Sequence, residues 1–259
     1  MRLRILIIAL GLLCSASAQD HGGQSDMSNM PGMNHDMSVM HDQAGADHAM
    51  HAMQSQHMDM GPHMKMTTLR NPQPGDQERA AQIVTDARKA VEKYQDYHVA
   101  LDDGFKIFLP NVPQKMYHFT SRRNAFEAAF HFDPGKPTSL LYEKHGDDYK
   151  LIGLMYTAPR TMKEDQLNQR VPLSVAQWHE HVNLCLPPQD QQSQLGGDRP
   201  RFGLRGSIAS ESECKDAGGR WIPQVFGWMV HMYPFEQNAA DIWSLERQHA
   251  AIAGHDHVD

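Results

Sequence analysis

The sequence predicts an α+β protein with a mainly antiparallel sheet, an N-terminal helix and short flanking helices, preceded by a disordered arm. The sheet is predicted by two strand-like runs, "TSLLYEK" (138–144) and "YKLIGLMYT" (149–157), separated by the polar "HGDD". That pattern is typical of a β-hairpin. The helix is predicted by apolar residues at helical spacing after Asp76, and the arm by a sharp change of composition before it.

The helix that begins near Asp76 should run for roughly 20 residues, because its apolar positions fall on one face; these are Ile83, Ala87, Ala90, Val91 and Tyr94. A further short helix is expected within 121–132. Capping boxes, in which the first side chain and the fourth bond each other's backbone N–H, predict two more helices. They are formed by Thr161 with Glu164 and by Ser210 with Glu213.

Two more apolar runs read as core strands with a long polar loop (187–200) between them. They are "VAQWHEHVNLCL" (175–186) and "QVFGWMVHMYPF" (224–235). Runs of strands with helices outside them favour an antiparallel sheet with helices packed on it. The sequence therefore predicts one globular domain over 76–248, with a flexible polar tail over 249–259.

The first eighteen residues resemble a secretory signal peptide. Arg2 and Arg4 precede a short apolar run, and small residues end the segment at Ala18. The apolar run is too short to span a bilayer. A lipoprotein reading of Cys14 is weaker, because the bulky Leu13 occupies a position where lipid attachment favours a small residue. We expect cleavage after Ala18, a periplasmic mature protein and no membrane span.

Loss of Arg2 and Arg4 leaves 22 basic residues against 31 acidic ones, and no basic run remains. This balance does not favour nucleic acid as a partner. Two cysteines remain after cleavage, Cys185 and Cys214. In an oxidising compartment such a pair predicts one disulfide, and the alternative is that Cys185 is a free thiolate ligand.

The arm (19–75, including its linker) contains eleven methionines and seven histidines between His21 and Met66 but almost no other large apolar residue. Such a segment buries too little apolar surface to order itself, so we expect it to be disordered. Thioethers are soft ligands that select Cu(I), and imidazole binds Cu(I) or Cu(II). The alternative is a linker whose methionines do nothing or are oxidised sacrificially. The candidate arm ligands are Met27, Met30, Met33, His35, Met37, Met40, His41, Met50, Met53, Met58 and Met60.

The densest candidate site in the folded domain is "WHEHVNLC" (178–185). If this segment is a strand, His179, His181, Asn183 and Cys185 share one face, and the two histidines can bind one metal side by side. His231 should share a face with Met229 and Tyr233 on another strand. His118 and His131 are further candidates. Each histidine taken alone could equally be structural.

The arm resembles the Met/His-rich segments of bacterial copper-resistance proteins of the periplasm and outer membrane. The folded domain, over about residues 86 to 185, resembles an uncharacterised group of secreted bacterial proteins with a His/Glu/His pattern. The matching positions are His118, Glu143 and His181. The resemblance implies a transition-metal set of two histidines and one carboxylate, which His179 or His231 could complete. Glu143 alone would be read as an exposed strand charge.

We therefore expect a copper-binding protein for copper tolerance, buffering or delivery, with Cu(I) on the arm and copper or another transition metal in the core. Its partners would be metal ions and a copper exporter, oxidase or chaperone. The alternative is a secreted metalloenzyme whose His/His/Glu site activates water or oxygen and is loaded by the arm. A third possibility is an interaction module with structural histidines.

Overall fold

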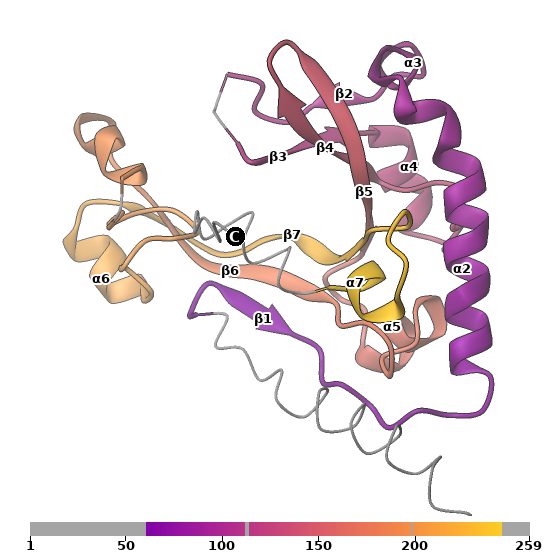
Figure 1. Ribbon diagram of the computed structural model, residues 1–259. Coiled ribbons are helices and arrows are strands. Elements are labelled where there is room, and N and C mark those ends of the chain that lie inside the picture. Colours follow the sequence, from indigo (N-terminus) through magenta and orange to yellow (C-terminus); the bar gives the residue numbers. More distant parts are fainter. Residues whose placement is uncertain (1–60, 112–113, 198, 245–259) are drawn as a thin grey trace, which may run out of the picture. The chain divides into compact units, whose positions relative to one another are not determined.

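The computed structural model describes residues 61–111, 114–197 and 199–244, and these form an α+β fold as predicted. A seven-stranded antiparallel sheet has the order β1-β6-β7-β5-β4-β3-β2 (Figure 1). Its strands are β1 (Met64–Met66), β2 (Lys106–Ile107), β3 (Met116–Thr120), β4 (Ser139–His145), β5 (Asp148–Ala158), β6 (His179–Leu186) and β7 (Arg220–Met232). The predicted signal peptide, the predicted arm up to residue 60, residues 245–248 of the predicted domain and the predicted tail (249–259) lie outside the described residues.

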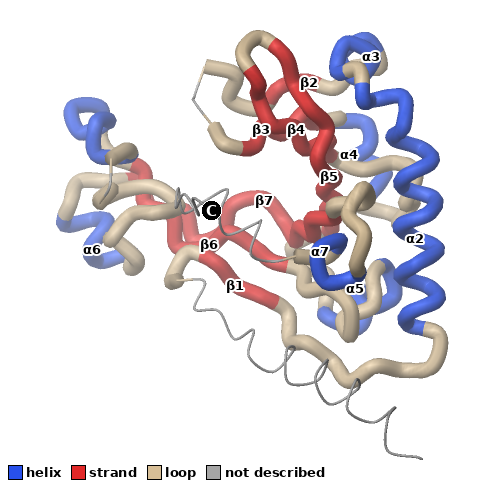
Figure 2. The backbone as a smooth tube through the Cα atoms, in the orientation of Figure 1, coloured by secondary structure: helices blue, strands red, loops and turns tan. Residues whose placement is uncertain are grey.

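The longest helix, α2 (Asp76–Val91), runs along one side of the sheet and continues into the 3-10 turn η1 (Glu92–Gln95) (Figure 1). Most shorter helices lie toward the same side, whereas α6 lies at the far end of β6 and β7 (Figure 2). The shorter helices are α3 (Tyr97–Asp102), α4 (Arg122–Ala128), α5 (Glu164–Arg170), η2 (Gln189–Leu195), α6 (Glu211–Asp216) and α7 (Ala239–Ile242). In the described part of the chain, no helix is long and apolar enough to cross a membrane.

The main hydrophobic core lies between α2 and the sheet. Ala87 and Val91 are fully buried in it, together with Phe119 of β3 and Trp178 just before β6. The buried Tyr142 donates a hydrogen bond from its hydroxyl to the Tyr94 carbonyl at 2.7 Å, which ties β4 to the end of the helix. This core occupies one face of the sheet and leaves the other face to a smaller cluster of mixed chemistry.

Several local predictions are confirmed. β4 and β5 pair as a hairpin around the polar turn, with His145 opposite Asp148. The capping box before α6 is present, since the Ser210 side chain accepts from the Glu213 N–H and Glu213 bonds back to the cap. The Cys185–Cys214 disulfide is present as well, so Cys185 is not a free thiolate.

The capping box at Thr161 is wrong. The chain makes a turn there, with the Met162 N–H bonded to the Pro159 carbonyl at 3.0 Å, and α5 begins after Lys163 instead. The Glu164 carboxylate, which the box required, accepts from the Thr68 N–H at 3.0 Å. A contact from a distant segment therefore takes the group that the local pattern assigned to the cap.

The predicted boundary at residue 76 also differs from the structure. β1 lies within the segment expected to be disordered, and it pairs antiparallel with β6. It could not be recognised from sequence because it is three residues long and lies in a methionine-rich stretch. The two core strands also shift, since β6 begins only at His179 and β7 begins earlier than expected, at Arg220.

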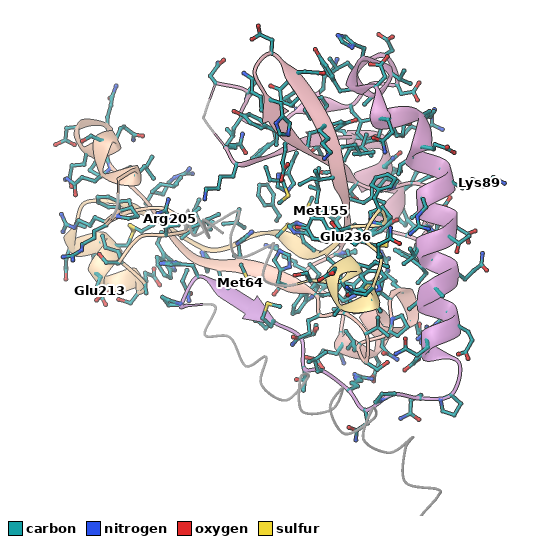
Figure 3. All side chains as sticks on the ribbon, in the orientation of Figure 1. Met64, Lys89, Met155, Arg205, Glu213 and Glu236 are labelled. Carbon is teal, nitrogen blue, oxygen red and sulfur yellow. A yellow bond between two sulfur atoms is a disulfide. The ribbon has the colours of Figure 1, made fainter. Side chains whose placement is uncertain are left out.

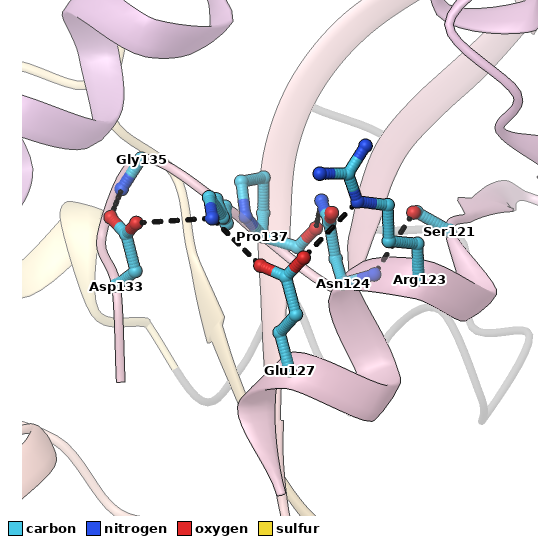
Figure 4. Close-up of polar contacts among 8 residues, drawn as sticks. Ser121, Arg123, Asn124, Glu127, Asp133, Gly135 and Pro137 are labelled. Carbon is cyan, nitrogen blue, oxygen red and sulfur yellow. Dashed lines mark hydrogen bonds and ion pairs between the residues drawn. The ribbon is translucent and has the colours of Figure 1, made fainter. Parts of the chain in front are cut away.

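The connection from α4 to β4 is held by a group of polar contacts (Figure 4). Glu127 accepts from Arg123 at 3.1 Å and from Lys136 at 2.7 Å, and Asn124 donates to the Pro137 carbonyl at 2.8 Å. These contacts fix the entry of the chain into β4, and through its pairing they fix β3, which carries His118.

Candidate functional site

Four histidines from three strands meet on the sheet face opposite α2. We call His118 of β3, His179 and His181 of β6, and His231 of β7 the histidine cluster. The ring centroids of His118 and His231 are 5.7 Å apart, those of His231 and His179 are 5.1 Å apart, and those of His179 and His181 are 5.5 Å apart. The cluster is therefore a continuous set of neighbouring imidazoles.

The curl of the sheet brings His118 into this cluster. β5 and β4 separate β7 from β3 in the strand order. Strands that far apart in a flat sheet lie roughly 14 Å from each other, at about 4.8 Å per strand. The 5.7 Å between the His118 and His231 rings requires β3 and β4 to fold over β7 (Figure 1).

Gly153 of β5 permits close packing at the bend. A Cβ atom at this position would lie 2.8 Å from Tyr233 Cδ1 and 2.9 Å from the Met232 carbonyl oxygen. Both approaches are shorter than a side-chain carbon tolerates. Gly153 therefore lets Tyr233 and the end of β7 close against the middle of the sheet.

Substituting Gly153 with alanine is expected to lower the free energy of unfolding by about 1–3 kcal/mol, the usual penalty for overpacking. The backbone must shift, so the spacing of the histidine cluster should change as well. Urea denaturation measures the loss, and Gly196→Ala is the matched control because no atom lies within 4 Å of a Cβ there. Equal stability of Gly153→Ala and Gly196→Ala would contradict this role.

Two of the four histidines, His179 and His231, are buried, and ring nitrogens of both lack partners. His179 is 0% exposed and His231 is 5% exposed. Both ring nitrogens of His179 lack a hydrogen-bond partner, and so does Nδ1 of His231. Buried polar atoms are nearly always satisfied, and one left alone costs about 1–3 kcal/mol. Each neutral ring has one nitrogen with a lone pair, and such a nitrogen left unpaired fits a ligand that accepts the lone pair.

Burial keeps these imidazoles neutral. Loss of solvation lowers the pKa of His118 to about 4 and the pKa of His179 to about 3, and neighbouring histidines lower both further. Loss of solvation also lowers the pKa of His181 to about 4 and lowers the pKa of His231 well below its ordinary value. Neutral imidazole is the form that binds metals, so the cluster is in its ligating form at neutral pH.

The metal-free protein is expected to lose stability as the pH falls from about 6.5 toward 4. The pKa values of the folded state lie below the unfolded value near 6.5, so the unfolded chain takes up protons first. The stability is thus fully present above about pH 6.5. Below that pH, each histidine that stays neutral in the folded protein lowers the free energy of unfolding by about 1.4 kcal/mol per pH unit.

Urea denaturation at a series of pH values measures this dependence. His118→Gln should reduce the slope of the free energy of unfolding against pH by the equivalent of about one proton, because one imidazole with a lowered pKa is removed. A free energy of unfolding that stays constant between about pH 7 and pH 5 would contradict the prediction.

Methionines lie beside the cluster; from the sequence we placed Met64 and Met66 in the copper-binding arm and did not name Met155 or Met229 as ligands. Across the strand pairs, Met64 lies opposite His181, Met66 and Met229 lie opposite His179, and Met155 lies opposite His231. Met64 and Met155 are labelled in Figure 3. The strand-like runs "YKLIGLMYT" and "WMVHM" were the available signal for Met155 and Met229, whereas "MKM" is too short to indicate a strand.

Glu143 pairs with His145 instead of a histidine of the cluster. Glu143 lies in β4 opposite Met116, its side chain is 50% exposed, and its carboxylate lies 3.6 Å from Nε2 of His145. His131 lies beside α4, where it lines a small cavity with Glu127 and Asp133. The expected side-by-side placement of His179 and His181 is found. The predicted arm ligands from Met27 to Met60 lie outside the described residues.

The expected alternation along β6 fails beyond His181. Asn183 has a left-handed backbone with φ of 58°, and its side chain donates to the Pro62 carbonyl at 2.7 Å. The pairing of β6 with β7 also shifts between His179 and His181, where β7 bulges. Bulges are common beside functional sites because they redirect side chains.

Over the described ranges, no three His, Cys, Asp or Glu side chains stand in an arrangement that could hold a metal ion as placed. The distances between neighbouring rings are nevertheless close to those of two imidazoles that bind the same ion. With metal–nitrogen bonds of about 2.0–2.1 Å, two imidazoles on one tetrahedral ion have centroids roughly 5 Å apart. The imidazoles therefore need to turn, more than to approach, in order to share an ion.

The fold and the site together define an α+β protein with a partly buried histidine cluster on the sheet face opposite α2. No family model matches the chain, and neither a curated protein nor a solved structure does.

Proposed function

We propose that the protein is a periplasmic copper-binding protein that serves copper tolerance by buffering or delivering the ion. The observation that carries the proposal is the histidine cluster, in which His179 is fully buried with both ring nitrogens unpartnered. A metal ion would take the lone pair of one nitrogen of each ring and offset part of the cost of burying it. His118, His181 and His231 are the other candidate ligands.

Copper is favoured over other transition metals by the sulfur chemistry of the chain. The arm carries methionines as its main large apolar residues, and more methionines lie beside the histidine cluster. Thioethers select Cu(I), whereas zinc sites use thiolate, imidazole and carboxylate. The signal-peptide pattern and the disulfide support an oxidising compartment, where methionine remains a usable ligand.

The metalloenzyme alternative receives less support. It requires Glu143 as a ligand with His118 and His181, and Glu143 is half exposed on β4 beside His145.

The test is equilibrium binding of Cu(I) and Cu(II) to the full-length mature chain with a competing chelator. We expect His179→Gln/His231→Gln to remove one tight equivalent. Losing even an outer-shell partner weakens metal binding about 10–100-fold, so losing two ligands should exceed that. His145→Gln is the matched control, because His145 is an exposed histidine of the same sheet.

Unchanged copper binding in His179→Gln/His231→Gln would refute the core site, and the arm would then be the whole copper-binding part. Binding of no copper by the wild-type chain would refute the function altogether.

A further inference from the structure

β1 places two thioethers directly beside the histidine cluster. Met64 pairs with His181 and Met66 pairs with His179 in the antiparallel register of β1 and β6. Directly opposite residues in such a pair have Cβ atoms about 4.5–5.5 Å apart and point to the same face. Each methionine is therefore the lateral neighbour of one histidine.

Contacts on the other face of β1 confirm this assignment of faces. Lys65, between the two methionines, pairs with Glu180 at 3.4 Å and lies 4.7 Å from the centroid of the Trp228 ring. Trp228 belongs to the core beneath α2. Because Lys65 and Glu180 point toward that side, Met64 and Met66 point to the side of the histidine cluster.

β1 is held firmly in its register. The buried His63, just before it, has one ring nitrogen 2.9 Å from the Asn183 carbonyl and the other 2.7 Å from the Gly206 carbonyl. After the strand, the Thr67 N–H donates to the Trp178 carbonyl at 2.8 Å. The Thr67 hydroxyl accepts from the Trp178 N–H at 3.0 Å. The position of the two methionines is thus set from both ends.

The methionines form the accessible margin of the cluster. β1 is an edge strand, and Met64, Met66 and His181 are partly buried, whereas His179 is fully buried. On its far side His179 faces Met229 of β7. A row of thioether, imidazole and thioether therefore runs from the edge of the sheet inward, through Met66, His179 and Met229.

We propose that Met64 and Met66 are ligands of the core site and make it a Cu(I) site. This inference rests on the proposed function and adds the oxidation state of the ion and two ligands. Soft thioether sulfur favours Cu(I), while Zn(II) and Cu(II) are better served by imidazole alone. Removing the two sulfurs should therefore weaken Cu(I) binding selectively.

The test uses the full-length mature chain with ¹³C-labelled methionine methyl groups, titrated to saturation with Cu(I) under anaerobic conditions. We expect the methyl signals of Met64 and Met66 to shift in the same step as the imidazole signals of His179 and His181. In Met64→Leu/Met66→Leu, the affinity for Cu(I) measured from the histidine signals should fall at least tenfold. The affinity of the histidines for Zn(II) should stay within twofold of the wild-type value.

Met232→Leu is the matched control, because Met232 is fully buried in β7 but belongs to the core beneath α2. Leucine replaces methionine with little change of volume, so all these variants should fold.

Histidine signals that shift while the Met64 and Met66 signals stay fixed would overturn the inference and leave the proposed function standing. An equal weakening of Cu(I) and Zn(II) in Met64→Leu/Met66→Leu would overturn it too, because it would mean that β1 acts only by shaping the site. Histidine signals that shift with neither Cu(I) nor Zn(II) would refute the core copper site itself.

Discussion

Replacing His179 with leucine is expected to stabilise the metal-free protein by roughly 1–3 kcal/mol, although most core substitutions destabilise. His179 is fully buried, and both its ring nitrogens lack hydrogen-bond partners. Leucine has a similar size, needs no partner and lies among apolar neighbours such as Met229. The same change should weaken copper binding at least tenfold, because a ligand is lost.

Urea denaturation of both proteins, with and without one equivalent of copper, measures the two effects together. We expect copper to raise the free energy of unfolding of the wild type and to have a much smaller effect on His179→Leu, because binding to the folded state alone stabilises it. His145→Leu is the control, since its exposed ring has no such burial to relieve. Destabilisation of the metal-free protein by His179→Leu would mean that bound water satisfies the His179 nitrogens.

Removing the disulfide with Cys185→Ala/Cys214→Ala is expected to lower the free energy of unfolding by roughly 3–4 kcal/mol, from the loop entropy that the cross-link removes from the unfolded chain. The bond joins β6 to α6 across 29 residues. It lies in a small separate core with Phe202, Ile208 and Ala217. Without the bond, this core alone must hold α6 against the sheet.

Chemical reduction of the wild-type protein should reproduce the loss seen in the double variant. Copper binding at the histidine cluster should be retained at low denaturant, because β1 and β7 hold the histidine end of β6 on both sides. A loss below about 1 kcal/mol would show that the closed loop is already restricted in the unfolded chain.

Features decided by neighbouring residues could be predicted from the sequence. The hairpin of β4 and β5 follows from alternation around a polar turn, and the cap of α6 follows from Ser210 with Glu213. The disulfide followed from the count of cysteines, since only one pairing was possible outside the predicted signal peptide. The pairing of His179 with His181 followed from their spacing along one strand.

Features decided by distant segments could not be predicted. Thr161 had the local pattern of a cap, but Glu164 binds the Thr68 N–H instead. Glu143 matched a resemblance, but its carboxylate pairs with His145, which is not a member of the histidine cluster. The short β1 was hidden because three residues carry too little periodicity to indicate a strand.

The sequence by itself determined the chemistry of this protein, namely an arm rich in methionine and histidine, a signal-peptide pattern, one disulfide and several histidines in strand-like segments. Only the tertiary structure decided which histidines meet. His118 and His231 become neighbours because the sheet curls across β5 and β4, with Gly153 admitting Tyr233 at the bend. Met64 and Met66 lie beside the histidines because β1 pairs at the edge of β6. Residue type is a local property, whereas curl and edge pairing arise from packing among segments far apart in the chain.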